Sequence, residues 1–296
     1  MTDARRLVPV PPRPDLPLDE RLAAVQVAFG GRIGLHATHL ESGREVSLHA
    51  DERFGTASVI KVALVAALLE RVRRGEADLD EAVELAPRAE RVTGGGILKH
   101  LEASRFSLRD LCELPIVVSD NAATNAVFER CGGAGPVAAL FADLGLRCSA
   151  MPGPVDFARI DHTVDGAIGV STPRETASLM AALARGTILD RRLCDVLLAM
   201  LRRQHYQDQI PRWLSWNPYA QWHGRREPLE VANKTGELDG IRNDCAVITR
   251  EGHGSVAIAI FTDGCRDLRE SVDNAGTLAV AECAAAIAAA LLGIDA

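Results

Sequence analysis

The sequence contains few aromatic residues and no run of basic residues. Only 4% of its 296 residues are aromatic, and the formal net charge is −7. Without a cluster of Lys and Arg, nucleic acid is not expected as a main partner. The composition is otherwise that of an ordinary globular protein, with 47% hydrophobic and 25% charged residues. The length allows one large domain or two lobes.

Segments that would carry the chain to a membrane are also lacking. The opening stretch MTDARRLVPVPPRPDLPLDE is polar and proline-rich and has no apolar signal region. LAVAECAAAIAAALLGI comes nearest to a membrane span, but it is Ala-rich and carries Glu282. We therefore expect a buried helix from about Leu268 to Leu292, and no membrane partner.

Cysteine pairs at metal-binding spacing are missing. The seven cysteines are widely spaced and form no CxxC motif, so neither a zinc site nor a disulfide framework is expected. Free thiols suit a reducing compartment, which predicts a cytoplasmic protein. No metal and no organic cofactor is implied.

The order of elements predicts an α+β fold. After an irregular N-terminal lead at 1–24, two strands flank the turn Ser42-Gly43, a long helical region follows, and three strands and a helix end the chain. The prediction is an antiparallel five-stranded sheet flanked by helices, plus a mostly helical lobe. The sheet lobe would comprise about 25–56 and 224–296, and the helical lobe about 57–223. A binding cleft is expected where the lobes meet.

The stretch TASVIKVALVAALLE places Ser58 and Lys61 three residues apart, on one face of a predicted helix. A lysine among apolar neighbours loses its charge more easily, and a neutral amine can take the proton of a nearby serine. A position at the helix N-terminus would favour developing negative charge. The alternative is that Ser58 caps the helix while Lys61 extends to the surface.

A second motif, VVSDNAATN, contains Ser119, Asp120 and Asn121 between two predicted helices. Ser119 could pass a proton to a leaving nitrogen, Asn121 could bind a substrate amide, and Asp120 is expected to organise the loop. The alternative is an ordinary turn with Asx hydrogen bonding.

A third motif, VANKTGELDGIRND, places Lys234, Thr235 and Gly236 on a predicted strand. Lys234 and Thr235 suit a carboxylate, and Arg242 could add a second cation across a hairpin. Gly236 would let a substrate backbone approach the strand edge. The alternative is an exposed lysine on an edge strand.

Each motif is weak alone, but S-x-x-K, S-D-N and K-T-G occur here in that order. The chain resembles the serine β-lactamase and penicillin-binding protein superfamily, and most of all its class A type, over about residues 25–295. STPRETASLM, after a long loop, and GIRND, after K-T-G, add to the likeness. The resemblance implies a hydrolase that opens a cyclic amide, or β-lactam, through an acyl-enzyme.

The resemblance also assigns roles to residues. Ser58 would attack the carbonyl, Lys61 would take part in its activation, and Ser119 would assist proton delivery to the leaving nitrogen. Asn121 would hold the side-chain amide of the substrate. The substrate carboxylate would be bound by Lys234, Thr235 and Arg242, and the oxyanion by the backbone N–H groups of Ser58 and of Glu237, which follows Gly236.

One loop departs from the family pattern. Class A enzymes carry a glutamate and, four residues later, an asparagine before the segment that here reads STPRETASLM; together they position the deacylating water. MPGPVDFARIDHTVDGAIGV contains neither residue type. Alignment without gaps places Asp156 and Ile160 at these positions, and Asp161 and Asp165 are further carboxylates. All three aspartates could equally be solvated loop residues, so acylation is better supported than deacylation.

The Trp and Tyr residues are concentrated in YQDQIPRWLSWNPYAQW, from Tyr206 to Trp222. This segment leads into the K-T-G strand, so its rings are expected either to contact substrate or to pack a long connection onto the sheet.

The leading interpretation is a class A-like β-lactamase acting on a small, anionic amide or ester. A D-Ala-D-Ala peptidase, another amidase or esterase, and a slowly deacylating penicillin-binding protein are the alternatives.

Overall fold

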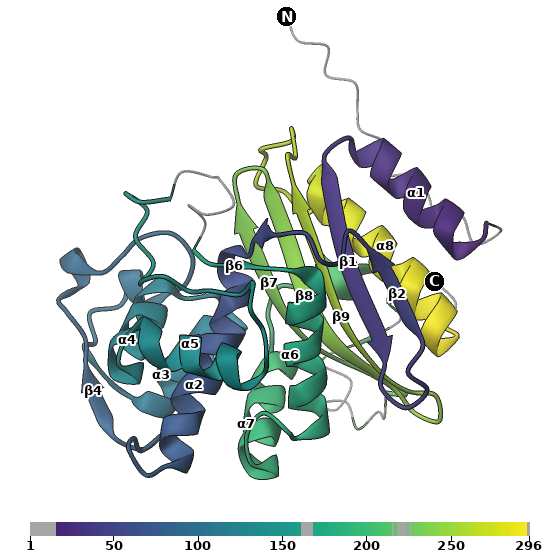
Figure 1. Ribbon diagram of the computed structural model, residues 1–296. Coiled ribbons are helices and arrows are strands. Elements are labelled where there is room, and N and C mark those ends of the chain that lie inside the picture. Colours follow the sequence, from purple (N-terminus) through teal and green to yellow (C-terminus); the bar gives the residue numbers. More distant parts are fainter. Residues whose placement is uncertain (1–15, 161–167, 215, 218–223, 225–226, 295–296) are drawn as a thin grey trace, which may run out of the picture.

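A five-stranded antiparallel sheet forms the centre of the fold, in the order β2-β1-β9-β8-β7 (Figure 1). The computed structural model describes residues 16–160, 168–214, 216–217, 224 and 227–294. The strands are β1 (Arg32–His39), β2 (Glu45–Leu48), β7 (Leu229–Leu238), β8 (Ile241–Arg250) and β9 (Gly254–Asp263). Two come from the start of the chain and three from its end, so the predicted α+β class and sheet are confirmed.

Helices cover both faces of this sheet (Figure 1). Helices α1 (Leu18–Phe29) and α8 (Ala275–Leu292) pack together on one face, and α6 (Pro173–Arg185) lies on the other. Strand β9 supplies both cores because successive side chains alternate between faces. Ala257, Ala259 and Phe261 join the core with α6, whereas Val256, Ile258 and Ile260 join the core with α8.

The remaining helices form the second lobe around α2 (Lys61–Arg73), in which every residue from Lys61 to Leu69 is buried. Around it lie α3 (Leu108–Val117), α4 (Asn121–Cys131), α5 (Ala134–Asp143) and α7 (Arg191–Arg202). Short 3₁₀ helices are η1 (Ala57–Ile60), η2 (Arg88–Glu90), η3 (Leu98–His100) and η4 (Ile210–Trp213). Two small strand pairs join β3 (Phe54–Gly55) to β6 (Val170–Ser171), and β4 (Ala82–Glu84) to β5 (Arg105–Ser107).

Three helices, α1, α6 and α8, differ from the sequence prediction. Helix α1 begins at Leu18, inside the lead predicted at 1–24, because Leu22 and Val25 provide an apolar side that packs toward α8. Helix α6 packs on the sheet, although its residues were assigned to the helical lobe.

The C-terminal helix begins at Ala275 rather than near Leu268, because Asn274 accepts hydrogen bonds from the first free backbone N–H groups. Its composition and length would also suit a membrane span, yet 83% of it is buried inside the protein. The prediction of a buried helix is therefore confirmed.

Candidate active site

Ser58 lies in the 3₁₀ helix η1, directly before α2, and it is only 8% exposed. The preceding Ala57 has a φ of 46°, in the left-handed region that a residue with a Cβ adopts only under strain. Ser58 lines a cavity of about 640 Å³ between the two lobes. The predicted helix start is thus a tight turn that leads into α2 and presents Ser58 to the cavity.

Lys61 is fully buried and directed toward the S-D-N segment. Its Nζ lies 2.8 Å from the carbonyl oxygen of Ser119, 2.8 Å from Asn121 Oδ1 and 3.2 Å from Ser119 Oγ. Burial, and then the nearby charge of Lys234, hold the pKa of Lys61 well below its usual range, against a smaller opposing effect of Asp120. The alternative in which Lys61 extends to the surface is wrong.

The geometry around Lys61 suits a proton carrier. The carbonyl and carboxamide oxygens can only accept, so they occupy two N–H groups of the amine. The third contact is a hydroxyl, which can accept from an ammonium or donate to the lone pair of a neutral amine. Lys61 is therefore placed to exchange a proton with Ser119.

The S-D-N segment joins α3 to α4. Ser119 adopts a φ of 55°, and the following N–H, of Asp120, donates to Leu114 O to close the end of α3. Asp120 then caps α4 by accepting from Ala123 N at 2.9 Å. The second oxygen of Asp120 accepts from the backbone N–H groups of Ile97 and Leu98. Asp120 therefore organises the loop, as predicted, and Ser119 and Asn121 line the cavity beside Ser58.

The K-T-G segment lies on β7, the edge strand nearest η1. Thr235 lines the cavity, while Lys234 is fully buried and its Nζ donates to Thr235 O at 2.6 Å. A Cβ on Gly236 would lie 2.6 Å from Thr56 O and 3.0 Å from Ser58 N. The close approach at Gly236 is thus to the nucleophile segment, not to a substrate as the sequence suggested.

Burial lowers the pKa of Lys234 to about 8, while the nearby Asp244 raises it to a smaller extent. Burial also raises the pKa of Asp244 to about 8, although Ile210 N and Asn233 Nδ2 donate to its carboxylate. Because the two groups stabilise each other's charge, Lys234 keeps its charge more readily than Lys61 does.

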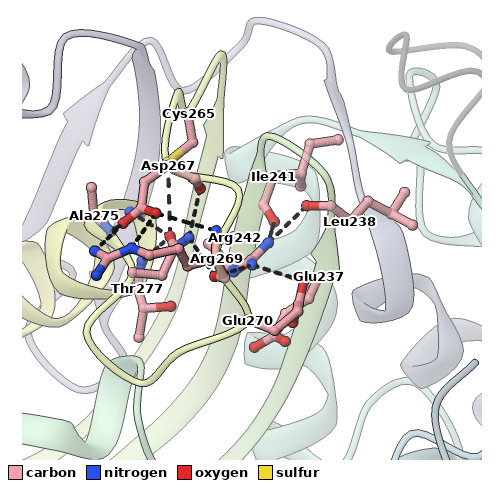
Figure 2. Close-up of polar contacts among 12 residues, drawn as sticks. Glu237, Leu238, Ile241, Arg242, Cys265, Asp267, Arg269, Glu270, Ala275 and Thr277 are labelled. Carbon is pink, nitrogen blue, oxygen red and sulfur yellow. Dashed lines mark hydrogen bonds and ion pairs between the residues drawn. The ribbon is translucent and has the colours of Figure 1, made fainter. Parts of the chain in front are cut away.

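Arg242 does not line the cavity, contrary to the sequence prediction. The residue is 2% exposed, and one guanidinium nitrogen donates to Leu238 O at 2.7 Å and to Ile241 O at 2.8 Å. The other terminal nitrogen pairs with the Glu270 carboxylate at 3.2 Å (Figure 2). The N–H groups of Arg242 therefore already donate to the β7–β8 hairpin and to the loop before α8.

Glu237 was predicted to contribute only its backbone N–H. The structure shows that Glu237 also lines the cavity, where Gln209 Nε2 donates to its carboxylate at 3.1 Å. Burial and then the neighbouring Asp208 raise the pKa of Glu237, while Arg242 lowers it. Ser58 N and the strand that carries Glu237 lie together, as an oxyanion site requires.

The cavity is therefore lined by a serine hydroxyl and an edge strand, and a buried amine of lowered pKa lies next to its lining residue Ser119. Residues 17–291 match the model of a β-lactamase enzyme family. The chain belongs to this β-lactamase family. β-Lactamase L2 of Stenotrophomonas maltophilia is 30% identical over 230 residues, covering 76% of this chain and 71% of that protein. The carbapenem-hydrolysing β-lactamase KPC of Klebsiella oxytoca is 27% identical over 93% of this chain and 89% of that one.

Solved structures that are similar to this chain agree with the fold. A β-lactamase from Sphaerobacter thermophilus is 29% identical, with a TM-score of 0.81, and the match covers 94% of this chain and 97% of that one. The structure of PBP-A, at 24% identity and a TM-score of 0.74, covers 94% and 98% and shows the same fold.

The described part of the loop before α6 directs apolar side chains into the cavity. Phe157, Ile160 and Ile168 line the cavity. The predicted surrogate base, Asp156, instead pairs with Arg159 at 3.2 Å and accepts from Ala158 N, with 42% of its side chain exposed. The structure does not bring Asp156 to Ser58.

The remaining loop acids that the sequence singled out, Asp161 and Asp165, lie outside the described residues. Within the part that the structure describes, no group of three or more His, Cys, Asp or Glu side chains is arranged to hold a metal ion.

The aromatic segment divides between the two predicted roles. Tyr206 lines the cavity, whereas Trp216 packs against the core with α8. Tyr219 and Trp222 lie outside the described residues.

Sequence reasoning missed Asp239 and Glu270 as cavity residues. Glu270 could not be placed, because its segment was predicted to be part of the last helix.

Proposed function

We propose that this protein is a serine hydrolase that opens β-lactams through an acyl-enzyme on Ser58. The observation that carries this proposal is Lys61, fully buried beneath the cavity that Ser58 lines, with its pKa lowered and its Nζ in contact with Ser119. An amine whose pKa is lowered loses its proton more readily, and a neutral amine can take the proton of a serine hydroxyl.

The steps up to the acyl-enzyme can each be assigned to a residue of the site. Neutral Lys61 accepts the proton of Ser58, and Ser58 Oγ attacks the carbonyl carbon. The backbone N–H groups of Ser58 and Glu237 stabilise the oxyanion. The proton passes from Lys61 through the Ser119 hydroxyl to the leaving nitrogen, the C–N bond breaks, and an ester on Ser58 remains. Water then hydrolyses this ester.

Residues that line the cavity, or lie just behind its lining, also suggest which groups of a substrate could bind. Thr235 and the ammonium of Lys234 behind it suit a carboxylate on the leaving group, and Asn121 suits an amide on the acyl group. The substrate is therefore a small amide or ester that carries a carboxylate. Neither nucleic acid nor a membrane has a part in this proposal.

A slowly deacylating penicillin-binding protein or a D-Ala-D-Ala peptidase is the second candidate. The apolar lining that Phe157, Ile160 and Ile168 provide favours it, because a water held beside these side chains has no base in the described part of the loop. The two candidates share the first half of the reaction and differ only in the fate of the ester.

Turnover of a chromogenic cephalosporin tests the proposal. Wild type should release the chromophore over many cycles, and Ser58→Ala should abolish release and covalent labelling. Cleavage of a D-Ala-D-Ala peptide without cephalosporin turnover would favour the peptidase. Labelling of Ser58→Ala at the stoichiometry of wild type would show that another residue is the nucleophile.

In the cell, we infer destruction of a β-lactam, as antibiotic resistance or as catabolism, in the cytoplasm. Support for that location comes from the seven unpaired cysteines, of which six are buried.

A further inference from the structure

Phe157 is a phenylalanine on the wall of the cavity, and 43% of this residue is exposed. The other phenylalanines in the described part of the chain are buried or half-buried. An aromatic ring that is open at a cavity wall keeps apolar surface that a ligand can cover, and covering this surface adds to affinity. Phe157 is therefore suited to contact an apolar group of the substrate.

The backbone that carries Phe157 is held in place. Val155 N donates to Asn125 Oδ1 at 2.8 Å, and Asn125 Nδ2 donates to Val155 O at 2.9 Å, so α4 fixes the chain two residues before the ring. Arg159 N donates to Asp156 O at 3.0 Å and closes a turn that contains Phe157. A ring on such a turn loses little freedom when a ligand packs against it, which favours binding.

Gly94 allows the Phe157 ring to lie beside the S-D-N segment. Gly94 has a φ of 91°, and a Cβ built on it would lie 2.7 Å from Phe157 Cζ and 2.8 Å from Asn121 Nδ2. Non-bonded carbon atoms prefer separations of about 3.5–4.0 Å, so a side chain at this position would displace the ring or the carboxamide. The missing side chain of Gly94 thus makes the Phe157 ring and the Asn121 amide neighbours.

The Asn121 carboxamide connects this ring to the reaction centre. Its Oδ1 accepts from Lys61 Nζ at 2.8 Å, and its Nδ2 donates to Thr93 O at 3.2 Å. Because an amide nitrogen carries two N–H groups, one N–H of Asn121 has no partner among the described residues and can donate to a substrate carbonyl. A substrate amide held there would bring the group on its carbonyl carbon next to Phe157.

We propose that Phe157 determines the specificity for the acyl group, so that the preferred substrate carries an aromatic ring there. This ring would pack on Phe157, with the adjoining amide carbonyl at Asn121 Nδ2. Ile160 and Ile168, which also line the cavity, would cover more of its apolar surface. The inference rests on the proposed acyl-enzyme function, whose substrate class it narrows.

Three penicillins that differ only in the acyl group test this inference: the phenylacetyl, cyclohexylacetyl and acetyl compounds. In second-order acylation of wild type, the phenylacetyl compound should be at least about tenfold faster than the acetyl compound, because it buries a whole ring. It should be about threefold faster than the cyclohexylacetyl compound, because two aromatic rings attract each other beyond their buried area. A phenylacetyl rate equal to either of the other two would overturn the inference.

Matched variants locate the effect. Phe157→Ala should reduce both preferences to near parity, while Phe157→Tyr, which retains a ring, should keep them. Leu101→Ala removes an apolar side chain of similar exposure, 39%, that does not line the cavity, and it should leave both preferences unchanged. If Phe157 only packed the loop, Phe157→Ala would change all three rates by the same factor, and that result would refute the inference.

A binding measurement separates this inference from the proposed function. N-Phenylacetylglycine and N-acetylglycine share an amide and a carboxylate but have no β-lactam ring to open, and their binding can be followed by chemical shifts. Wild type should bind the phenylacetyl compound at least about tenfold more tightly, and Phe157→Ala should bind both alike. If no penicillin acylates the protein, the function fails, and this measurement alone decides the role of Phe157. Equal affinities in wild type, or a difference that Phe157→Ala retains, would refute that role.

Discussion

Lys61 and Lys234 are both fully buried, but their surroundings affect the pKa of each side chain differently. The Lys61 amine donates to neutral oxygens of Ser119 and Asn121, and burial, followed by the charge of Lys234, favours its neutral form. Lys234 lies near Asp244, and its pKa is lowered only to about 8. One lysine is suited to carry a proton and the other to hold a negative charge.

This difference predicts a pH effect that depends on substrate charge. Lys234 is charged below about pH 8, so kcat/KM for carboxylate substrates should fall as the pH rises through that value. A neutral ester should show no such decline. Lys234→Arg should remove it, because a guanidinium does not lose its proton in this range. An identical decline for both substrates in wild type would contradict the assigned role.

Arg242 is expected to act on stability rather than on selectivity. Arg242→Ala leaves Leu238 O and Ile241 O without their donors, which should lower the free energy of unfolding by roughly 1–3 kcal/mol. Arg266→Ala, an exposed arginine nearby, should change it by less than about 0.5 kcal/mol. Urea unfolding measures both variants. A tenfold loss confined to anionic substrates, with unchanged stability, would instead place Arg242 in the carboxylate site.

At the scale of elements, Asp120 connects α4 to the loop at residues 94–98. Its carboxylate accepts from Ala123 N, Ile97 N and Leu98 N, and Gly94 and Gly95 line the cavity. Asp120→Ala should lower stability by more than the 0.5–2 kcal/mol typical of a lost helix cap, and should slow acylation as well.

Thr172→Ala provides a control for the Asp120 experiment. Thr172 caps α6, where it accepts from Glu175 N, and it does not line the cavity. Thr172→Ala should remove this helix cap and so lower the stability of the protein, but it should not slow acylation. Equal effects of both variants on acylation, measured at a temperature where both are folded, would show that Asp120 has no role in the site.

The loop before α6 is expected to act without Asp156. Because that carboxylate is paired with Arg159 at the surface, Asp156→Asn should leave both acylation and deacylation unchanged. Single-turnover and steady-state rates with a penicillin measure the two steps. A selective slowing of deacylation would show that the loop rearranges to bring Asp156 to the ester, as the sequence alignment suggested.

Sequence reasoning predicted elements with a strong pattern and failed where a loop decides the structure. The strand-like segments at both ends of the chain predicted the sheet, and the apolar run after Lys61 predicted the helix that carries this lysine. The placement of Asp156 and Arg242 could not be predicted, because it depends on hydrogen bonds made by loops. Glu270 likewise lies in a loop that lines the cavity because the last helix begins at Ala275 instead of near Leu268.

At the scale of the whole molecule, the two lobes meet at a cavity whose described residues suit acylation better than deacylation. Ser58 and Ser119 line it, and Lys61 contacts Ser119, which is the arrangement that the proposed acylation uses. Among the described residues of the loop opposite, the side chains that line the cavity are apolar. The ester on Ser58 is therefore expected to form faster than it is hydrolysed.

Intact-mass measurement after rapid mixing with a penicillin tests this account most directly. The protein should gain the mass of one penicillin within the first turnover, peptide mapping should place it on Ser58, and the adduct should persist while substrate is slowly consumed. Ser58→Ala should gain no mass. Rapid steady turnover of penicillin by wild type with no detectable adduct, or an adduct on another residue, would contradict the account.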